Sequence, residues 1–451
     1  MKRIIKEKRI GSDKAPWPSQ RDIDTRVKLH ETYLRALPGG RRMVATFEDF
    51  SRRIIEGRDL STADLTGISL FSAQLNATKF IEACLYAADL RLAEMTAVDL
   101  SRSDLRGACF RGAVLSRAQL VEADMREGMI AKKGKRGELD TVRYEDAVSS
   151  ELSAARLNAA NLTRARMSNA FVMQTDLSDT VLRGSRFGRA NLSHALLKGS
   201  DMSDADFSGA NMAGADLQGA MLNGASLSGA NLENAVLLGA IMDNVDLSDC
   251  NLDGAVLARV MDSHGPEIAE MVNAHSTWVE TQGRDGRRAN FSGIEISEGD
   301  FRGANLSAAM MASAMMRASR FDQAVLVMAD LSVADLRDAA LTEGDLRGAN
   351  LDRATLTNAN LAGVKMEPME IRGGAKQTWP VSMQRARLNG CDLRQANMMS
   401  ARLTNSDFTG ANLSGVDFTG ADLSHCVFTG ANLAGTKFEN AMTQGAQGLN
   451  G

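Results

Sequence analysis

Large apolar residues recur at every fifth position over most of the chain, and the residue two positions earlier is usually alanine or another small residue. In the first stretch the large residues fall at multiples of five from Leu60 to Met125. A fixed short period of this kind is the signature of a repeat architecture. It fits neither the 3.6-residue helix nor the two-residue alternation of a flat strand, so the chain has to turn once in each unit.

One unit reads Ala210-Asn211-Met212-Ala213-Gly214. We expect Ala210 and Met212 to point inward, Asn211 to point outward, and the last two residues to form a corner. Glycine, asparagine and aspartate recur at these corners because tight turns need residues that tolerate unusual backbone angles. The 40 glycines and only 6 prolines of the chain fit that demand.

The repeated pattern of a small residue, Asp or Asn, Leu, any residue and Gly is best seen in Ala205-Asp206-Phe207-Ser208-Gly209. It resembles the pattern of the pentapeptide repeat family, over most of the chain. The resemblance implies an all-β fold, a right-handed quadrilateral parallel β-helix with one unit per side and four per coil, with short α-helical caps or insertions. If all units stacked without a break at the usual strand spacing of about 4.8 Å, they would form one long rod.

Interruptions of the period divide the chain into segments. We expect a basic, helical N-terminal cap at 1–57, repeat arrays at 58–127, 150–258, 289–366 and 382–440, a polar basic loop at 128–149, a helical insertion or second cap at 259–288, a linker or bend at 367–381, and a flexible tail at 441–451.

Two of these segments share a design that suits a cap. His30 and Tyr33 precede a Gly-Gly-Arg-Arg run, much as His275 and Trp278 precede Gly-Arg-Arg, and Pro266 suits the first turn of a helix there. Solenoid ends expose unpaired strand edges and core residues, so they need a lid. A second amphipathic helix is predicted near the N-terminus as a plug for the first coil, from the apolar residues Phe47, Phe50, Ile54 and Ile55.

Catalysis, cofactor binding and metal binding find little support in the sequence. The five histidines do not cluster, no Cys-x-x-Cys occurs, and no glycine-rich loop is followed by Lys-Ser or Lys-Thr. Cys250, Cys391 and Cys426 occupy the small inward position, where a thiol behaves as a compact apolar group. We therefore predict a protein that is not an enzyme, with no catalytic residues, cofactor or metal.

The compartment is expected to be the cytoplasm. No stretch approaches the length of a membrane span, and too few apolar residues lie near the N-terminus for a signal peptide. Met1 to Lys14 carry six bases, and the alternative to a plug at this end is a basic arm that binds nucleic acid or an anionic membrane. Direct nucleic-acid binding is otherwise not expected.

An acidic strip is the candidate interaction surface. From Ser200 to Ala258 there is no Lys or Arg, whereas the overall net charge is only −4. With four units per coil, two neighbouring sides would carry Asp201, Asp204, Asp206, Asp243, Asp246 and Asp249. Such a strip would attract basic partners. The alternative is that aspartate is simply the common outward residue of the repeat, solvated and without a partner.

Three hypotheses of function remain open. The favoured one is a non-enzymatic scaffold that binds unidentified proteins through its patterned outer faces. The second is an acidic DNA mimic that binds or protects a type II topoisomerase such as gyrase, because some members of the family resemble B-form DNA in shape and charge. The 52 Lys and Arg argue against it. The third is an effector delivered into another cell, for which the sequence offers no address.

A homodimer is a further expectation. The last units place large rings on alternating sides, and only a short glycine-rich tail follows them. These rings belong to Phe408, Phe418, Phe428 and Phe438. An uncapped terminal coil with an aromatic core is a plausible dimer surface, as it is in some relatives.

Overall fold

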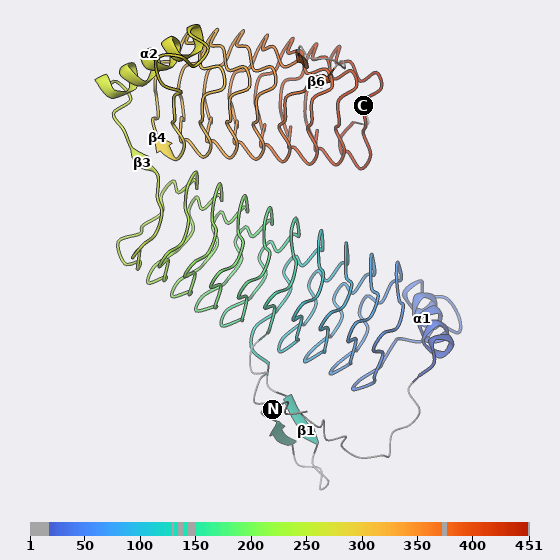
Figure 1. Cartoon of the computed structure of the whole chain (residues 1–451). Coiled ribbons are helices and arrows are strands. Elements are labelled where there is room, and N and C mark those ends of the chain that lie inside the picture. Colours follow the sequence, from blue (N-terminus) through green and yellow to red (C-terminus); the bar gives the residue numbers. More distant parts are fainter. Residues whose placement is uncertain (1–17, 129, 134–138, 143–149, 372–376, 450–451) are drawn as a thin grey trace, which may run out of the picture.

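The protein consists of two β-solenoids, seen in a computed structural model that describes residues 18–128, 130–133, 139–142, 150–371 and 377–449 (Figure 1). Each side of a coil is a short strand that forms one parallel bridge to the residue 20 positions on, as between Asp64 and Cys84 or Asn211 and Asn231. Because four five-residue units complete one coil, the cross-section is quadrilateral. The predicted fold class, a right-handed quadrilateral parallel β-helix with helical caps, is confirmed.

The core is built from the two inward positions of each unit. Ala210 and Met212 are 1% and 0% exposed. Identical positions of successive coils stack, so Phe301 lies over Phe321 with ring centroids 4.8 Å apart. Each fully buried large side chain contributes about 1.5–3 kcal/mol by leaving water.

Two insertions leave the solenoids without breaking the stack. Across the 128–149 insertion Asp124 bridges directly to Arg166, and across 367–381 Lys365 bridges to Asn397. The first insertion contains the antiparallel pair β1 (Ile130–Lys133) and β2 (Leu139–Val142), and the second contains β5 (Met369–Ile371) and β6 (Gln377–Trp379). Because the stack continues from Lys365 to Asn397, the described residues of 367–381 form an antiparallel strand pair beside it, and the bend considered for this segment is wrong.

A helix closes the start of each solenoid. Helix α1 (Gln20–Leu34) buries Ile23, Val27 and His30, and Ser19 forms a capping box with Asp22 at its N-terminus. Helix α2 (Pro266–Glu280) has Pro266 in its first turn and buries Ile268 and His275. In both caps the histidine Nδ1 accepts a hydrogen bond from the backbone N–H of the first repeat, Met43 at 2.9 Å and Ala289 at 3.0 Å.

The predicted second helix in the N-terminal cap is wrong. Val44 already bridges to Asp64, and Ile54 to Gln74, so residues 44–57 belong to the first coil of the solenoid. Phe50 and Ile55 fill its core at 1% and 3% exposure, while Phe47 and Ile54 point outward. Apolar residues three, four and five positions apart fit both a helix face and this repeat. The segment adopts the repeat because it can pair with the strand edge of the next coil. The basic arm expected at Met1 to Lys14 lies outside the described residues.

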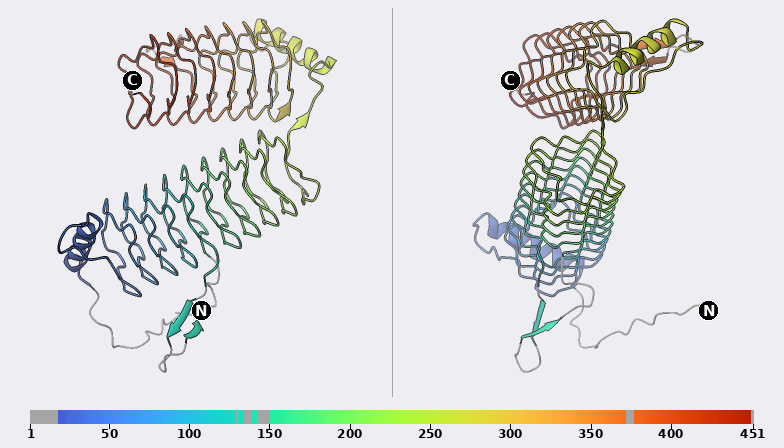
Figure 2. Two further views of the ribbon diagram at one scale, coloured as in Figure 1. Left: turned by 180° about the vertical axis from the view of Figure 1, so that it is seen from behind. Right: turned by 90° about the vertical axis from the view of Figure 1, so that its left-hand side faces the viewer.

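The two solenoids lie side by side and run in opposite directions, so the units do not form one rod (Figures 1 and 2). The connecting segment includes β3 (Arg259–Val260), which pairs in parallel with β4 (Ile294–Glu295) of the second solenoid. The direction follows from the contacts between the solenoids: Asp179 meets Arg353, whereas the later Asp243 meets the earlier Arg337. Within the described residues, neither helix is long and apolar enough to cross a membrane.

Candidate interaction surfaces

The six aspartates of the predicted acidic strip do not share one environment. Asp201 is only 6% exposed and pairs with Arg183. Asp243 pairs with Arg337 of the second solenoid. The other members remain on the outside, with Asp204, Asp246 and Asp249 exposed and Asp206 half-buried. Part of the strip thus has a basic partner within the same chain.

Arg337 joins the two solenoids by contacting one aspartate from each. Its guanidinium donates to Asp335 of its own solenoid at 2.8 Å and to Asp243 of the first solenoid at 2.5 Å. Burial lowers the pKa of Arg337, but the hydrogen bonds with the two carboxylates outweigh that effect and raise it. The bond from Arg337 likewise lowers the pKa of Asp243. Both groups therefore stay charged, and the contact is an ion pair.

A second cluster lies further along the same contact. Asp179 accepts from Arg353 at 2.8 Å and also pairs with Arg385. Arg387 donates to the backbone carbonyls of Gly199 and Gly219. Burial lowers the pKa of the Arg387 guanidinium, which is the cost of holding it between the solenoids. We call these inter-solenoid contacts of Arg337, Arg353, Arg385 and Arg387 the arginine clamp.

Glycines allow the close approach that the clamp needs. Gly199, Gly219 and Gly239 stack at one corner of the first solenoid, each with positive φ. A Cβ atom at Gly239 would lie 2.9 Å from the carbonyl oxygen of Val333, and one at Gly219 would overlap Val333 Cγ1. Only glycine therefore fits at positions 219 and 239, where the corner touches Val333 of the second solenoid.

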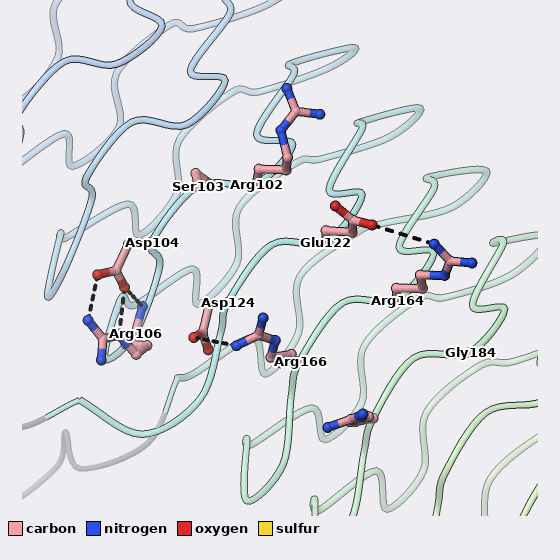
Figure 3. Close-up of a pocket in the computed structure, with 10 residues that line it drawn as sticks. Arg102, Ser103, Asp104, Arg106, Glu122, Asp124, Arg164, Arg166 and Gly184 are labelled. Atoms are coloured by element: carbon pink, nitrogen blue, oxygen red, sulfur yellow. Dashed lines mark hydrogen bonds and ion pairs between the residues drawn. The ribbon is translucent and has the colours of Figure 1, made fainter.

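The first solenoid also carries an arginine-lined pocket of about 760 Å³ (Figure 3). The floor and walls come from neighbouring coils on one side, and they include Asp104, Glu122 and Asp124 among the arginines. The arginines are Arg102, Arg106, Arg164, Arg166 and Arg186.

The arginines of this pocket differ in how many of their N–H groups already donate hydrogen bonds to carboxylates of the protein. Arg106 forms a two-pronged pair with Asp104, at 2.8 and 2.7 Å. Arg164 and Arg166 reach Glu122 and Asp124 only through ion pairs of 3.6 Å. The side chain of Arg186 has no hydrogen-bond or ion-pair partner among the described residues. Exposed pairs of this kind contribute about 0–1 kcal/mol, so these guanidiniums can exchange partners at little cost.

Sequence reasoning did not find this pocket, because the 128–149 insertion hides the register. Arg166 lies 42 positions after Asp124 but occupies the next coil. The signal was present: the apolar phase resumes after the insertion, and counting coils across it would have brought Arg164 and Arg166 beside Glu122 and Asp124. The described residues contain no group of three or more His, Cys, Asp or Glu side chains that could hold a metal ion.

Comparisons with known proteins identify the same five-residue repeat in this chain. The family model described as pentapeptide repeats matches eight copies, which together cover more than half of the chain. The matched ranges are 93–127, 149–179, 185–224, 220–259, 287–323, 334–367, 382–420 and 406–442. A search of curated proteins finds no match.

Solved structures of the same repeat are similar to parts of the chain. HetL, a pentapeptide repeat protein involved in heterocyst differentiation regulation from the cyanobacterium Nostoc sp. strain PCC 7120, is 30% identical; the match covers 49% of this chain and 94% of HetL, with a TM-score of 0.23. Rfr23 from the cyanobacterium Cyanothece 51142 is 26% identical over 23% of this chain and 62% of its own, with a TM-score of 0.20. Full-length QnrB1, a plasmid-mediated fluoroquinolone resistance protein, is 17% identical over 54% and 98%, with a TM-score of 0.24.

Proposed function

Because the chain belongs to the pentapeptide repeat family, we propose that it is a non-enzymatic scaffold that binds partner proteins through the outer faces of its two solenoids. The arginine-lined pocket carries this proposal. Arg164, Arg166 and Arg186 present guanidinium groups without a protein hydrogen bond on a concave surface. A rigid site with unused donors can bind a carboxylate-bearing surface without first reorganising.

The solenoid framework supports this role because it fixes the backbone positions from which these side chains extend. Every coil is bonded to the next through its backbone, and the arginine clamp holds one solenoid against the other. A preorganised surface loses little conformational entropy on binding, so even a small set of contacts contributes to affinity.

Affinity purification from the native host tests the proposal. We expect the tagged full chain to recover a partner reproducibly, and Arg164→Glu with Arg186→Glu to recover much less of it. Arg402→Glu is the matched control, since Arg402 is an exposed outward arginine of the second solenoid. Failure to recover any partner, or equal recovery by both variants, would contradict the proposal.

The DNA mimic remains the second candidate, favoured by the acids of the strip that stay on the outside. Asp204, Asp246 and Asp249 are exposed and face no base within the stretch from 200 to 258. Asp201 and Asp243 are already bound by arginines, which leaves a shorter acidic surface than the sequence suggests. A supercoiling assay with purified gyrase decides: neither inhibition nor protection by the full chain would eliminate this candidate.

A homodimer through the C-terminal coil is kept as part of the proposal. Phe438 is half-buried, stacks on Phe418 with centroids 5.7 Å apart, and no helix follows it within the described residues. Light scattering of the full chain tests the dimer, and a monomeric mass at all concentrations would contradict it.

A further inference from the structure

The far end of the first solenoid is left open. Inward residues are 1% exposed at Leu232 and Leu237, one coil before the end. In the last coil the equivalent positions Met242, Leu247 and Leu252 are only partly buried. Beyond them lie exposed apolar side chains at the exit of the solenoid, those of Val256, Leu257 and Val260.

Backbone donors are also unused at this end. In the preceding coil the N–H of Leu232 donates to the carbonyl of Asn251, and that of Leu237 to the carbonyl of Val256, each at 2.8 Å. The corresponding N–H groups of Met242, Leu247 and Leu252 have no acceptor among the described residues. A strand edge of this kind pairs readily with an added strand.

The rim of the open end is acidic. Asp246, Asp249 and Asp253 lie in the last coil, and none of them forms an ion pair with a described residue, whereas Asp243 is bound by Arg337. No Lys, Arg or His occurs between Ser200 and Ala258. The open end therefore combines exposed core, free strand donors and uncompensated negative charge.

We propose that the open end of the first solenoid, residues 242–257, is a docking site for a basic, extended segment of a partner protein. The segment adds a strand to each free edge it reaches, places apolar side chains over Leu247 and Leu252, and directs lysine or arginine to Asp246, Asp249 and Asp253. Main-chain pairing supplies affinity and the acidic rim supplies selectivity. This inference rests on the proposed scaffold function and names one of its surfaces.

Charge selects this occupant over a second copy of the chain. Two copies meeting at this end would bring two sets of three unpaired carboxylates together, and like charges at an interface cost affinity. The C-terminal end of the second solenoid differs, because its last coil carries both Lys437 and Glu439. The starts of both solenoids differ as well, because α1 and α2 cover them and bury Ile23 and Ile268 there.

Binding of synthetic peptides to the full chain tests the proposal. The probe is a fluorescein-labelled peptide of about nine residues that alternates lysine and valine, the strand pattern for a half-buried edge. A glutamate–valine peptide is the charge control, and a lysine–valine peptide with proline at its centre is the pairing control. Fluorescence polarisation reports affinity, and hydrogen exchange locates the protected amides.

We expect the lysine–valine peptide to bind and the two control peptides to bind at least about tenfold more weakly. Protection is expected at one or more of the amides of Met242, Leu247 and Leu252, because these lie on successive sides of the coil and a straight strand pairs with one side at a time. Asp246→Lys with Asp249→Lys should weaken binding by about tenfold or more, whereas Glu439→Lys at the other open end should leave it unchanged.

The proposal is overturned if the peptide does not bind, if the double variant binds it unchanged, or if protection appears at the coil of Phe438 instead. The same double variant separates this failure from failure of the scaffold function. If it still recovers the partner found by affinity purification, only the assignment of the open end is wrong.

Discussion

Arg337 of the second solenoid donates from Nη1 to Asp243 Oδ2 of the first over 2.5 Å, although 94 positions separate the two residues in the sequence. The pair holds together the two antiparallel solenoids, an arrangement that we call the solenoid hairpin. Asp243 and Asp179 are the two acids of the first solenoid that the arginine clamp binds. The arrangement of the whole molecule therefore depends on a few charged side chains as well as on the core.

Removing both acids of the clamp should open the hairpin. In the double variant Asp179→Asn with Asp243→Asn, the arginines stay buried but lose their counter-ions. We therefore expect the free energy of docking between the two solenoids to become less favourable by about 1–3 kcal/mol. Small-angle scattering should show a larger radius of gyration, and added salt should open the wild-type protein in the same direction.

The control for the clamp is Asp300→Asn with Asp392→Asn. These acids pair with Arg302 and Arg394, each two positions away in the same solenoid, and form no ion pair with a described residue of the first solenoid. An unchanged radius is expected for the control. An equal change in both double variants would contradict the clamp.

Gly219 provides a test of steric fit. Alanine at Gly219 or at Gly229 must adopt a positive φ, which costs about 1–2 kcal/mol in either case. Only the Cβ at Gly219 meets Val333, because no atom lies within 4 Å of a Cβ at Gly229. We expect Gly219→Ala to increase the radius of gyration and Gly229→Ala to leave it unchanged; the same scattering result for both would show that the corner does not touch.

The sequence predicts the coils but not the hairpin, and Gly219 and Gly229 show why. Both are glycines at the corner of a five-residue unit with the same local pattern, so nothing local marks the one that faces another solenoid. The core was predictable because, with a period of five, Met212 and the equivalent large apolar residues can all be buried only if they point into the coil. Charge alone marks Asp243 as a residue that would attract a base, but its partner Arg337 depends on how residues 258–265 turn the chain.

The inward thiols should be unreactive in the folded protein. Burial raises the pKa of Cys426 to about 12 and raises that of Cys391 as well. The thiolate is the reactive form, so alkylation by iodoacetamide at pH 8 should spare both residues until the protein is unfolded. Mass spectrometry of the alkylated peptides measures this, with denatured protein as the control. Rapid labelling of Cys426 without denaturant would mean that the second solenoid opens.

The two cap histidines should make stability depend on pH. Burial lowers the pKa of both His30 and His275 below the ordinary value of 6.5. Each ring must also stay neutral at Nδ1 to accept the backbone N–H of Met43 or Ala289. The unfolded chain takes up a proton first as the pH falls, so the contribution of the histidines is complete above about pH 6.5 and is lost progressively below it.

We therefore expect the Tm, followed by circular dichroism, to fall between about pH 6.5 and pH 5, a window above the ordinary pKa of the carboxylates. His30→Gln with His275→Gln should lower the Tm at pH 8 and flatten its fall in that window, because glutamine has no proton to gain. His264→Gln is the control, since His264 is exposed. A slope that persists unchanged in the double variant would assign the pH dependence to other groups, and the caps would then hold their solenoids through apolar packing at Ile23, Val27 and Ile268 alone.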